Sequence, residues 1–152
     1  MSALPQLSVS SYSYSVRRVA HSRADTLQVD TGSSNTWVGA GKAYVNTSTS
    51  TNTGKSVSVA YGSGFFSGTE YIDQVTLASG LVISNQSIGV ASQAEGFNGY
   101  DGILGIGPVD LTEGTVSSTD SVPTVTDNLF SQVSIDLPRH DEVGTLMMMG
   151  LS

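Results

Sequence analysis

The chain has 152 residues, no cysteine, and a formal net charge of −7 from 13 acidic and 6 basic residues. This length suits one domain that buries a core without disulfides. The acidic balance argues against a partner that is nucleic acid or an anionic membrane, and no apolar run approaches the roughly 20 residues that span a bilayer. Because cysteine is absent and His21 and His140 are the only histidines, we expect no metal site and no cysteine nucleophile. The remaining chemistry belongs to carboxylates and hydroxyl groups.

Serine and threonine supply the polar surface that charged residues supply in an average soluble domain. Charged residues make up 12% of the chain, about half the share of an average soluble domain. A surface with few ion pairs loses little stability when acid protonates its carboxylates. This composition suits an extracellular protein that works in acid, and it equally suits an ordinary β-rich domain.

Two short patterns concern secretion. The tripeptides at 46–48 (Asn-Thr-Ser) and 85–87 (Asn-Gln-Ser) have the pattern of N-glycosylation sites, although such tripeptides also occur by chance. Residues 1–18 contain no apolar signal core, so we expect a secreted protein whose leader is absent from this sequence.

A glycine-rich sequence with few helix-forming residues predicts an all-β fold. The first expected strand, residues 27–29, runs into a tight turn at 30–33, and residues 35–38 leave this turn extended. Alternating residues 56–60, a glycine turn at 61–64 and a second extended stretch predict a long hairpin over 57–77.

Shorter elements follow the hairpin. Two short strands are expected at 81–83 and 86–91, on either side of Ser84 and Asn85. Asp127 and the apolar pair after it favour one short helix over 126–132. A terminal strand is expected at 143–149.

The turn Asp30-Thr31-Gly32-Ser33 is the first feature that indicates chemistry. A carboxylate at the end of an apolar strand can be held by backbone N–H groups, and Ser33 can donate a hydrogen bond to it. Gly32 lets the backbone approach closely. Taken alone, the same triplet also suits a strand-end turn with a local hydrogen bond.

Three further motifs follow in order: Trp37, the only tryptophan, seven residues after Asp30; the glycine-rich turn at 61–64; and the apolar strand bounded by glycines at 101–107. Together with residues 67–71 and 123–132, they resemble the amino-terminal lobe of the pepsin-like aspartic proteases. Within that family the sequence of residues 29–132 is most similar to the cysteine-free, fungal, polyporopepsin-like secreted branch.

The resemblance implies a single pepsin-type β-barrel lobe over residues 1–152, with short helical turns. It also implies an aspartic endopeptidase, which hydrolyses peptide bonds in acid with an Asp-activated water. Its partner would be a peptide or protein substrate, and no cofactor or metal is implied.

The resemblance also implies roles for single residues. Asp30 would be a catalytic aspartate, Thr31 would join the two active-site loops, Gly32 would contact substrate, and Ser33 would hydrogen-bond the outer oxygen of Asp30. Tyr61 would tip a flap over the substrate with its hydroxyl near the Trp37 indole, and the backbones of Gly62 and Ser63 would bind the peptide. The residues expected to line an apolar pocket are Tyr100 and Ile103. Taken alone, these aromatic and aliphatic residues also suit a core, and Asp101 suits a loop acid.

The chain departs from the family in its second carboxylate. The family needs two aspartates that share a proton, whereas this chain has one Asp-Thr-Gly triplet, because Asp120-Ser121-Val122 lacks the glycine. Residues 10–25 and 133–142 are also atypical for the family. The second aspartate would come from a missing carboxy-terminal lobe or from a homodimer.

Two other functions remain open at this stage. One is a non-catalytic binding protein that uses the cleft of a pepsin-like lobe, which the missing carboxylate favours. The other is an inactive protease fragment, which the atypical segments favour.

Overall fold

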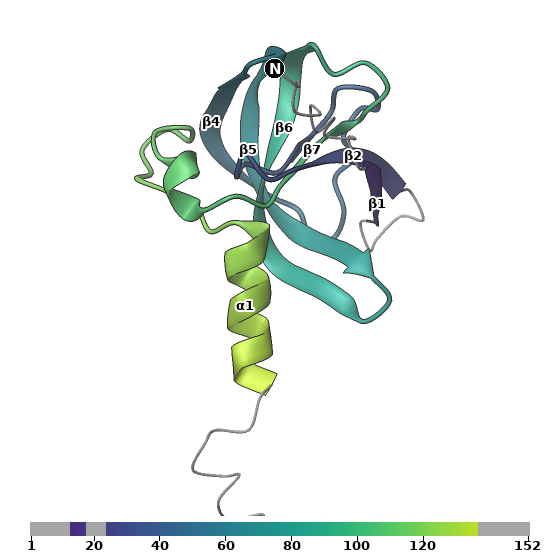
Figure 1. Cartoon of the computed structure of the whole chain (residues 1–152), viewed down its shortest axis with the longest axis vertical. Coiled ribbons are helices and arrows are strands. Elements are labelled where there is room, and N and C mark those ends of the chain that lie inside the picture. The colour runs from purple at the N-terminus through teal and green to yellow at the C-terminus, as the bar shows by residue number, and fades with distance from the viewer. Residues whose placement is uncertain (1–12, 18–23, 137–152) are drawn as a thin grey trace, which may run out of the picture.

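The computed structural model describes residues 13–17 and 24–136, and the expected strand at 143–149 lies outside them. The described elements are β1 (Ser13–Arg17), β2 (Ala24–Asp30), β3 (Trp37–Val38), β4 (Thr51–Tyr61), β5 (Gly64–Ala78), β6 (Leu81–Glu95), β7 (Gly102–Gly105), the short 3-10 helix η1 (Val109–Thr112) and α1 (Val125–Asp136) (Figure 1). The prediction of an all-β lobe with little helix is confirmed. No helix in these ranges is long and apolar enough to cross a membrane.

The seven strands form one curved sheet in the order β1-β2-β7-β3-β6-β5-β4. The expected closed barrel is wrong: β1 touches β5 through the single pair Arg17↔Thr76, and β4 bonds only β5 among the described strands. Strand β1 was not predicted, although Tyr12, Tyr14 and Val16 alternate with serines in the pattern of a half-buried strand.

Long hairpins dominate the sheet. Strands β4 and β5 pair from Thr51↔Ile72 to Tyr61↔Gly64, which confirms the predicted hairpin and extends it at its base. Strand β6 is continuous where two short strands were expected. The irregularity at Ser84 and Asn85 is a β-bulge, because both residues lie opposite the single residue Gln74.

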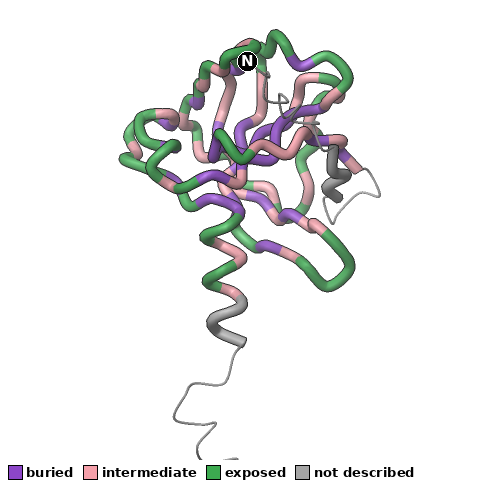
Figure 2. Tube along the Cα trace, in the orientation of Figure 1, coloured by how far each residue is buried: buried purple, intermediate pink, exposed green. Residues whose placement is uncertain are grey.

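Two apolar clusters fill the core, and Figure 2 shows the buried segments on the inner strands. One gathers side chains of β2, β5, β6 and α1, among them Leu27, Ile83 and Val125. The other surrounds Trp37 and Phe66, which are fully buried. Ile103 of this second cluster lies on β7, the strand that pairs with β2 up to Asp30.

Helix α1 begins one residue before and ends four residues after the predicted range of 126–132. Its first turn has reciprocal capping bonds: the Thr124 hydroxyl accepts from the Asp127 N–H, and the Thr124 N–H donates to the Asp127 carboxylate at 2.9 Å. The helix points away from the sheet (Figure 1).

Buried Asp73 holds the loop between β3 and β4 without a cationic partner among the described residues. Its carboxylate accepts hydrogen bonds from the hydroxyls of Tyr44 at 2.9 Å, Thr49 at 2.5 Å and Ser50 at 2.9 Å, and from the Gln74 N–H. Burial alone would raise its pKa, but these donors outweigh burial and hold the pKa below its ordinary value. The loop is therefore fastened by neutral donors.

Replacing Asp73 by Asn should lower the free energy of unfolding at pH 6 by about 1–3 kcal/mol, since an amide cannot accept from all these donors. Because the folded-state pKa is lowered, the carboxylate's contribution is present above an ordinary pKa of about 4 and is lost as the pH falls through the folded value. In urea titrations, the difference in the free energy of unfolding between wild type and D73N should become smaller below about pH 4. The exposed Asp110 provides the control D110N; a gap that stays constant with pH would contradict this account.

Candidate active site

Two parallel strands place the carboxylate that dominates the site. Strands β2 and β7 pair from Leu27↔Gly102 to Asp30↔Gly105. The pairing continues into the turn, where the Ile106 N–H donates to the Asp30 carbonyl at 3.0 Å. Asp30 therefore stands at the end of β2 with its backbone fixed on both sides.

Glycines at both ends of β7 allow the segment after the Asp30 turn, residues 34–38, to pack closely against this strand. A Cβ on Gly105 would lie 2.5 Å from the carbonyl carbon of Ser34 and 2.7 Å from the oxygen of Asn35, and a Cβ on Gly102 would overlap the Trp37 carbonyl. Real Cβ atoms do not approach backbone this closely, so β7 can pass under the active-site loop only without side chains at these positions.

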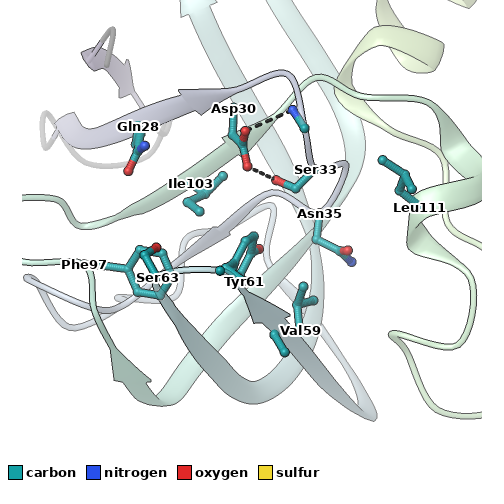
Figure 3. A pocket seen from close by; sticks show the side chains of 13 residues that line it. Gln28, Asp30, Ser33, Asn35, Val59, Tyr61, Ser63, Phe97, Ile103 and Leu111 are labelled. Carbon is teal, nitrogen blue, oxygen red and sulfur yellow. Dashed lines mark hydrogen bonds between the residues drawn. The ribbon is translucent and has the colours of Figure 1, made fainter. Parts of the chain in front are cut away.

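The Asp30 carboxylate is oriented by two local donors, drawn as dashed lines in Figure 3. The Gly32 N–H donates to Oδ1 at 3.0 Å, and the Ser33 hydroxyl donates to Oδ2 at 2.6 Å. Asp30 itself is half-buried, while Ser33 is buried. Each carboxylate oxygen thus has one fixed partner and keeps lone-pair capacity for a further group.

Tyr61 ends β4 at the tip of the hairpin and reaches back to the core. Its hydroxyl accepts a hydrogen bond from the Trp37 indole N–H at 3.0 Å. Burial raises the pKa of Tyr61 well above its ordinary value, the negative charge of Asp30 raises it further, and the Trp37 bond opposes both. Tyr61 therefore remains a neutral hydroxyl beside the carboxylate.

Aromatic packing fixes the end of this hairpin that carries Tyr61. Trp37 stacks on Phe66 with ring centroids 4.4 Å apart, and Phe97 meets both Trp37 and Tyr61 edge-on at 4.9 and 5.3 Å. Offset and edge-to-face pairs of this kind contribute beyond the area that they bury. The tip of the hairpin is thereby aligned with the turn at Asp30.

A cleft of about 570 Å³ lies between the hairpin and Asp30 (Figure 3). Its lining residues are Gln28, Asp30, Gly32, Ser33, Asn35, Val59, Ala60, Tyr61, Gly62, Ser63, Phe97, Ile103 and Leu111. Of these described residues Asp30 alone carries a carboxylate. The other lining side chains are mixed: an apolar set that includes Phe97, Ile103 and Leu111 lies beside polar groups such as Gln28 and Asn35, and such convergent polar groups can orient a ligand.

Most residues singled out in the sequence come together here. Asp30, Gly32, Ser33, Tyr61, Gly62, Ser63 and Ile103 line the cleft, and buried Trp37 supports Tyr61 from behind. Thr31 is exposed on the turn and is absent from the lining, as is Tyr100. Phe97 and Leu111 contribute the apolar surface that had been expected partly from Tyr100. Neither Phe97 nor Leu111 is predicted from the sequence, because both lie outside any periodic stretch.

Asp101 is separated from this chemistry. It is buried and accepts hydrogen bonds from the Thr26 N–H at 2.8 Å and from Lys42 Nζ at 2.7 Å. Lys42 also donates to the Ala24 carbonyl at 3.2 Å. The interpretation of Asp101 as a hydrogen-bonded loop acid agrees with these contacts, which tie the loop after β3 to β2.

The strand order, the hairpin above Asp30 and the glycine-bounded β7 together define a pepsin-type lobe. Residues 12–141 match the family model described as eukaryotic aspartyl protease. The chain therefore belongs to this family.

Individual relatives agree. Over 112 residues the chain is 68% identical to polyporopepsin from Irpex lacteus, an alignment covering 72% of this chain and 33% of that protein. Embryonic pepsinogen from Gallus gallus is 32% identical over 123 residues, which cover 70% of this chain and 30% of the relative. The crystal structure of the aspartic proteinase from Irpex lacteus superposes with a TM-score of 0.77 at 62% identity, over 80% of this chain and 36% of that one. The chain thus spans about a third of these relatives.

Replacing Gly105 by Ala tests the close packing of β7 against the segment that follows the Asp30 turn. The new Cβ would press on the backbone of Ser34 and Asn35, so the free energy of unfolding should fall by at least about 2 kcal/mol. The matched control is Gly62→Ala, because nothing lies within 4 Å of a Cβ there. Denaturant unfolding of both variants measures the effect, and equal losses would contradict the close-packing argument.

Replacing Tyr61 by Phe should leave the buried Trp37 N–H without its acceptor and lower the free energy of unfolding by about 1–3 kcal/mol. Since Trp37 is the only tryptophan, its fluorescence spectrum should change as well. In the control Tyr71→Phe, the lost hydroxyl partner is the exposed amide of Asn52, so the spectrum should stay as in the wild type. An unchanged Trp37 spectrum in Y61F would count against the bond.

Proposed function

We propose that this chain acts as the amino-terminal lobe of an acid-acting aspartic endopeptidase and supplies Asp30 as one of two catalytic carboxylates. The observation that carries the proposal is the position of Asp30. It is held by the Gly32 N–H and the Ser33 hydroxyl in a cleft under the Tyr61 hairpin, in a chain of the aspartyl protease family.

The proposed reaction needs two carboxylates that share one proton, since two like charges a few ångströms apart cannot both ionise. The ionised member accepts a proton from the attacking water, and the protonated member acts as the general acid. Asp30 provides one member. The second comes from another lobe with its own aspartate, which agrees with a chain that spans about a third of its relatives.

The other cleft residues position the substrate in this proposal. The backbones of Gly62 and Ser63 pair with an extended peptide, and Tyr61 closes over it. Ile103 and Phe97 receive an apolar side chain next to the scissile bond, which makes peptides with apolar residues the preferred substrate class. Exposed Thr31 is left to contact the second lobe. None of these steps requires a cofactor.

A non-catalytic binding module is the second candidate. It is favoured by the lining of the cleft, in which Asp30 is the sole carboxylate among the described residues. If the chain is instead an inactive fragment of a protease, the cleft would have the same lining, but neither catalysis nor peptide binding would be observed.

We also propose that the protein works outside the cell. Its support is the low charged fraction of 12% and a loop held to Asp73 by hydroxyl donors, which carry no charge at any ordinary pH. Because hydroxyl groups do not titrate at these pH values, the donors of such contacts are unchanged in acid.

A chimera tests the catalytic competence of this lobe. The 112 residues that match polyporopepsin would replace the corresponding segment of that protein. The chimera should cleave acid-denatured protein in a pepstatin-sensitive way, and Asp30→Asn should reduce kcat by at least about 100-fold, the scale of a lost acid–base group. Full pepstatin-sensitive activity in the D30N chimera would refute the role of Asp30.

The chain alone should be inactive as a monomer, because the cleft lined by the described residues offers no second carboxyl group to act as the acid. Peptide cleavage across protein concentration, with sedimentation in parallel, distinguishes the cases. Activity that rises with the square of concentration would indicate a homodimer in which two Asp30 side chains meet. Robust activity from a proven monomer would overturn the two-carboxylate proposal, and peptide binding without cleavage in the chimera would favour the binding module.

A further inference from the structure

Two surface asparagines begin glycosylation tripeptides that the cleft does not use. Asn46 lies in the loop between β3 and β4, and Asn85 lies within β6; both are exposed, and neither lines the cleft. The same tripeptide pattern therefore occurs in two different structural settings. The setting indicates which asparagine serves the fold and which is available for modification.

Asn85 has a conformational reason to be asparagine. Its φ of 58° is left-handed, and it occupies the bulge of β6 opposite Gln74. Among residues with a side chain, asparagine is one of those that tolerate this conformation best. The residue type at position 85 is thus explained by the backbone alone.

The rest of that tripeptide is withdrawn into the protein. Gln86 is buried, and its amide donates to the Pro123 carbonyl at 3.1 Å. The Ser87 hydroxyl donates to the buried carboxylate of Glu70 at 2.6 Å. Once β6 has formed, the hydroxyl that a glycosylating enzyme must recognise is engaged inside the sheet.

The tripeptide at Asn46 is presented differently. Asn46 and Ser48 are both exposed, Val45 before them is 46% exposed, and the segment belongs to no helix or strand. Asn46 is not among the described residues with a left-handed backbone, so the local conformation does not require asparagine. The hydroxyl-bearing residue and the acceptor amide are both at the surface.

The Asp73 network explains why this loop presents Asn46 outward. Tyr44 and Thr47, on either side of Asn46, donate their hydroxyls to Asp73 at 2.9 and 3.1 Å. With these two residues fastened inward, the segment between them is held at the surface. The folded loop therefore offers a stable, exposed acceptor.

We propose that Asn46 is an N-glycosylation site and that Asn85 is retained for its backbone conformation and stays unmodified. The inference rests on the extracellular placement under the proposed function. The donor is a lipid-pyrophosphate-linked oligosaccharide of the secretory pathway. A bond forms between Asn46 Nδ2 and the anomeric carbon, the bond from that carbon to the pyrophosphate oxygen breaks, the lipid pyrophosphate leaves with the electron pair, and Nδ2 loses one proton. A glycan there leaves the cleft open, because no residue of the tripeptide lines it.

The test is secretion of the full chain from yeast behind a cleavable leader. Intact mass and peptide mapping, before and after peptide-N-glycosidase F, would be read in both the secreted and the membrane-retained fractions. We expect one glycan, located at Asn46 and absent from N46Q and from S48A. The matched variants N85Q and N85G should keep it, and N85Q should have a lower thermal midpoint than N85G because glycine tolerates the left-handed backbone.

Three results would overturn the proposal: unmodified chain in both fractions, a glycan at Asn85 alone, or glycans at both positions. Because retained chain is analysed too, a variant that fails to fold still reports its modification. Peptidase activity does not enter this readout, so an inactive chimera would reject the proposed function and leave the assignment of Asn46 standing.

Discussion

The structure depends on the close parallel pairing of β2 with β7. Asp30 is useful only if its carboxylate stands at a fixed place above the sheet, and that place is set by the pairing Asp30↔Gly105 and by the bond from the Ile106 N–H. On its other side β7 needs glycine, because Gly102 and Gly105 lie against the backbone of residues 34–38, the segment that follows the Asp30 turn. The same strand also carries Ile103, so one element positions the carboxylate and builds the floor of the cleft.

Several carboxylates of this protein are stabilised by hydrogen bonds from neutral hydroxyl groups, a role that ion pairs often have in other proteins. Asp30, Asp73 and Glu70 each accept at least one hydroxyl hydrogen bond, and Ser33 donates the bond to Asp30 at 2.6 Å. A hydroxyl donor keeps its charge state when the pH falls, so only the acceptor titrates. The abundance of serine and threonine and the shortage of lysine and arginine are then two aspects of one arrangement, which suits acid.

Some of this structure could be predicted from local chemistry. The Asp30 turn, the long hairpin and the helix after Pro123 follow from turn glycines, alternation and a capping pair, all of which involve neighbouring residues. Strand β1 was missed although serines alternate with Tyr12, Tyr14 and Val16 in and just before it; its partners β2 and β5 follow only from the tertiary structure. Continuous β6 was missed because a bulge at Asn85 resembles a break in the sequence. Phe97 and Leu111 reach the cleft only through tertiary packing.

Under the proposed function, the hydrogen bonds at Asp30 also explain why one lobe would supply only half of a catalytic site. Ser33 has a single O–H, which it donates to Oδ2 of Asp30, and the Gly32 N–H is donated to Oδ1. Both donors orient the carboxylate, and neither is left to protonate a departing amine. Tyr61, whose pKa is raised, holds its proton too tightly to act as the acid near or below neutral pH. Asp30 is the one carboxylate among the described residues that line the cleft, so the proposed function needs a second carboxyl group from another lobe or another copy.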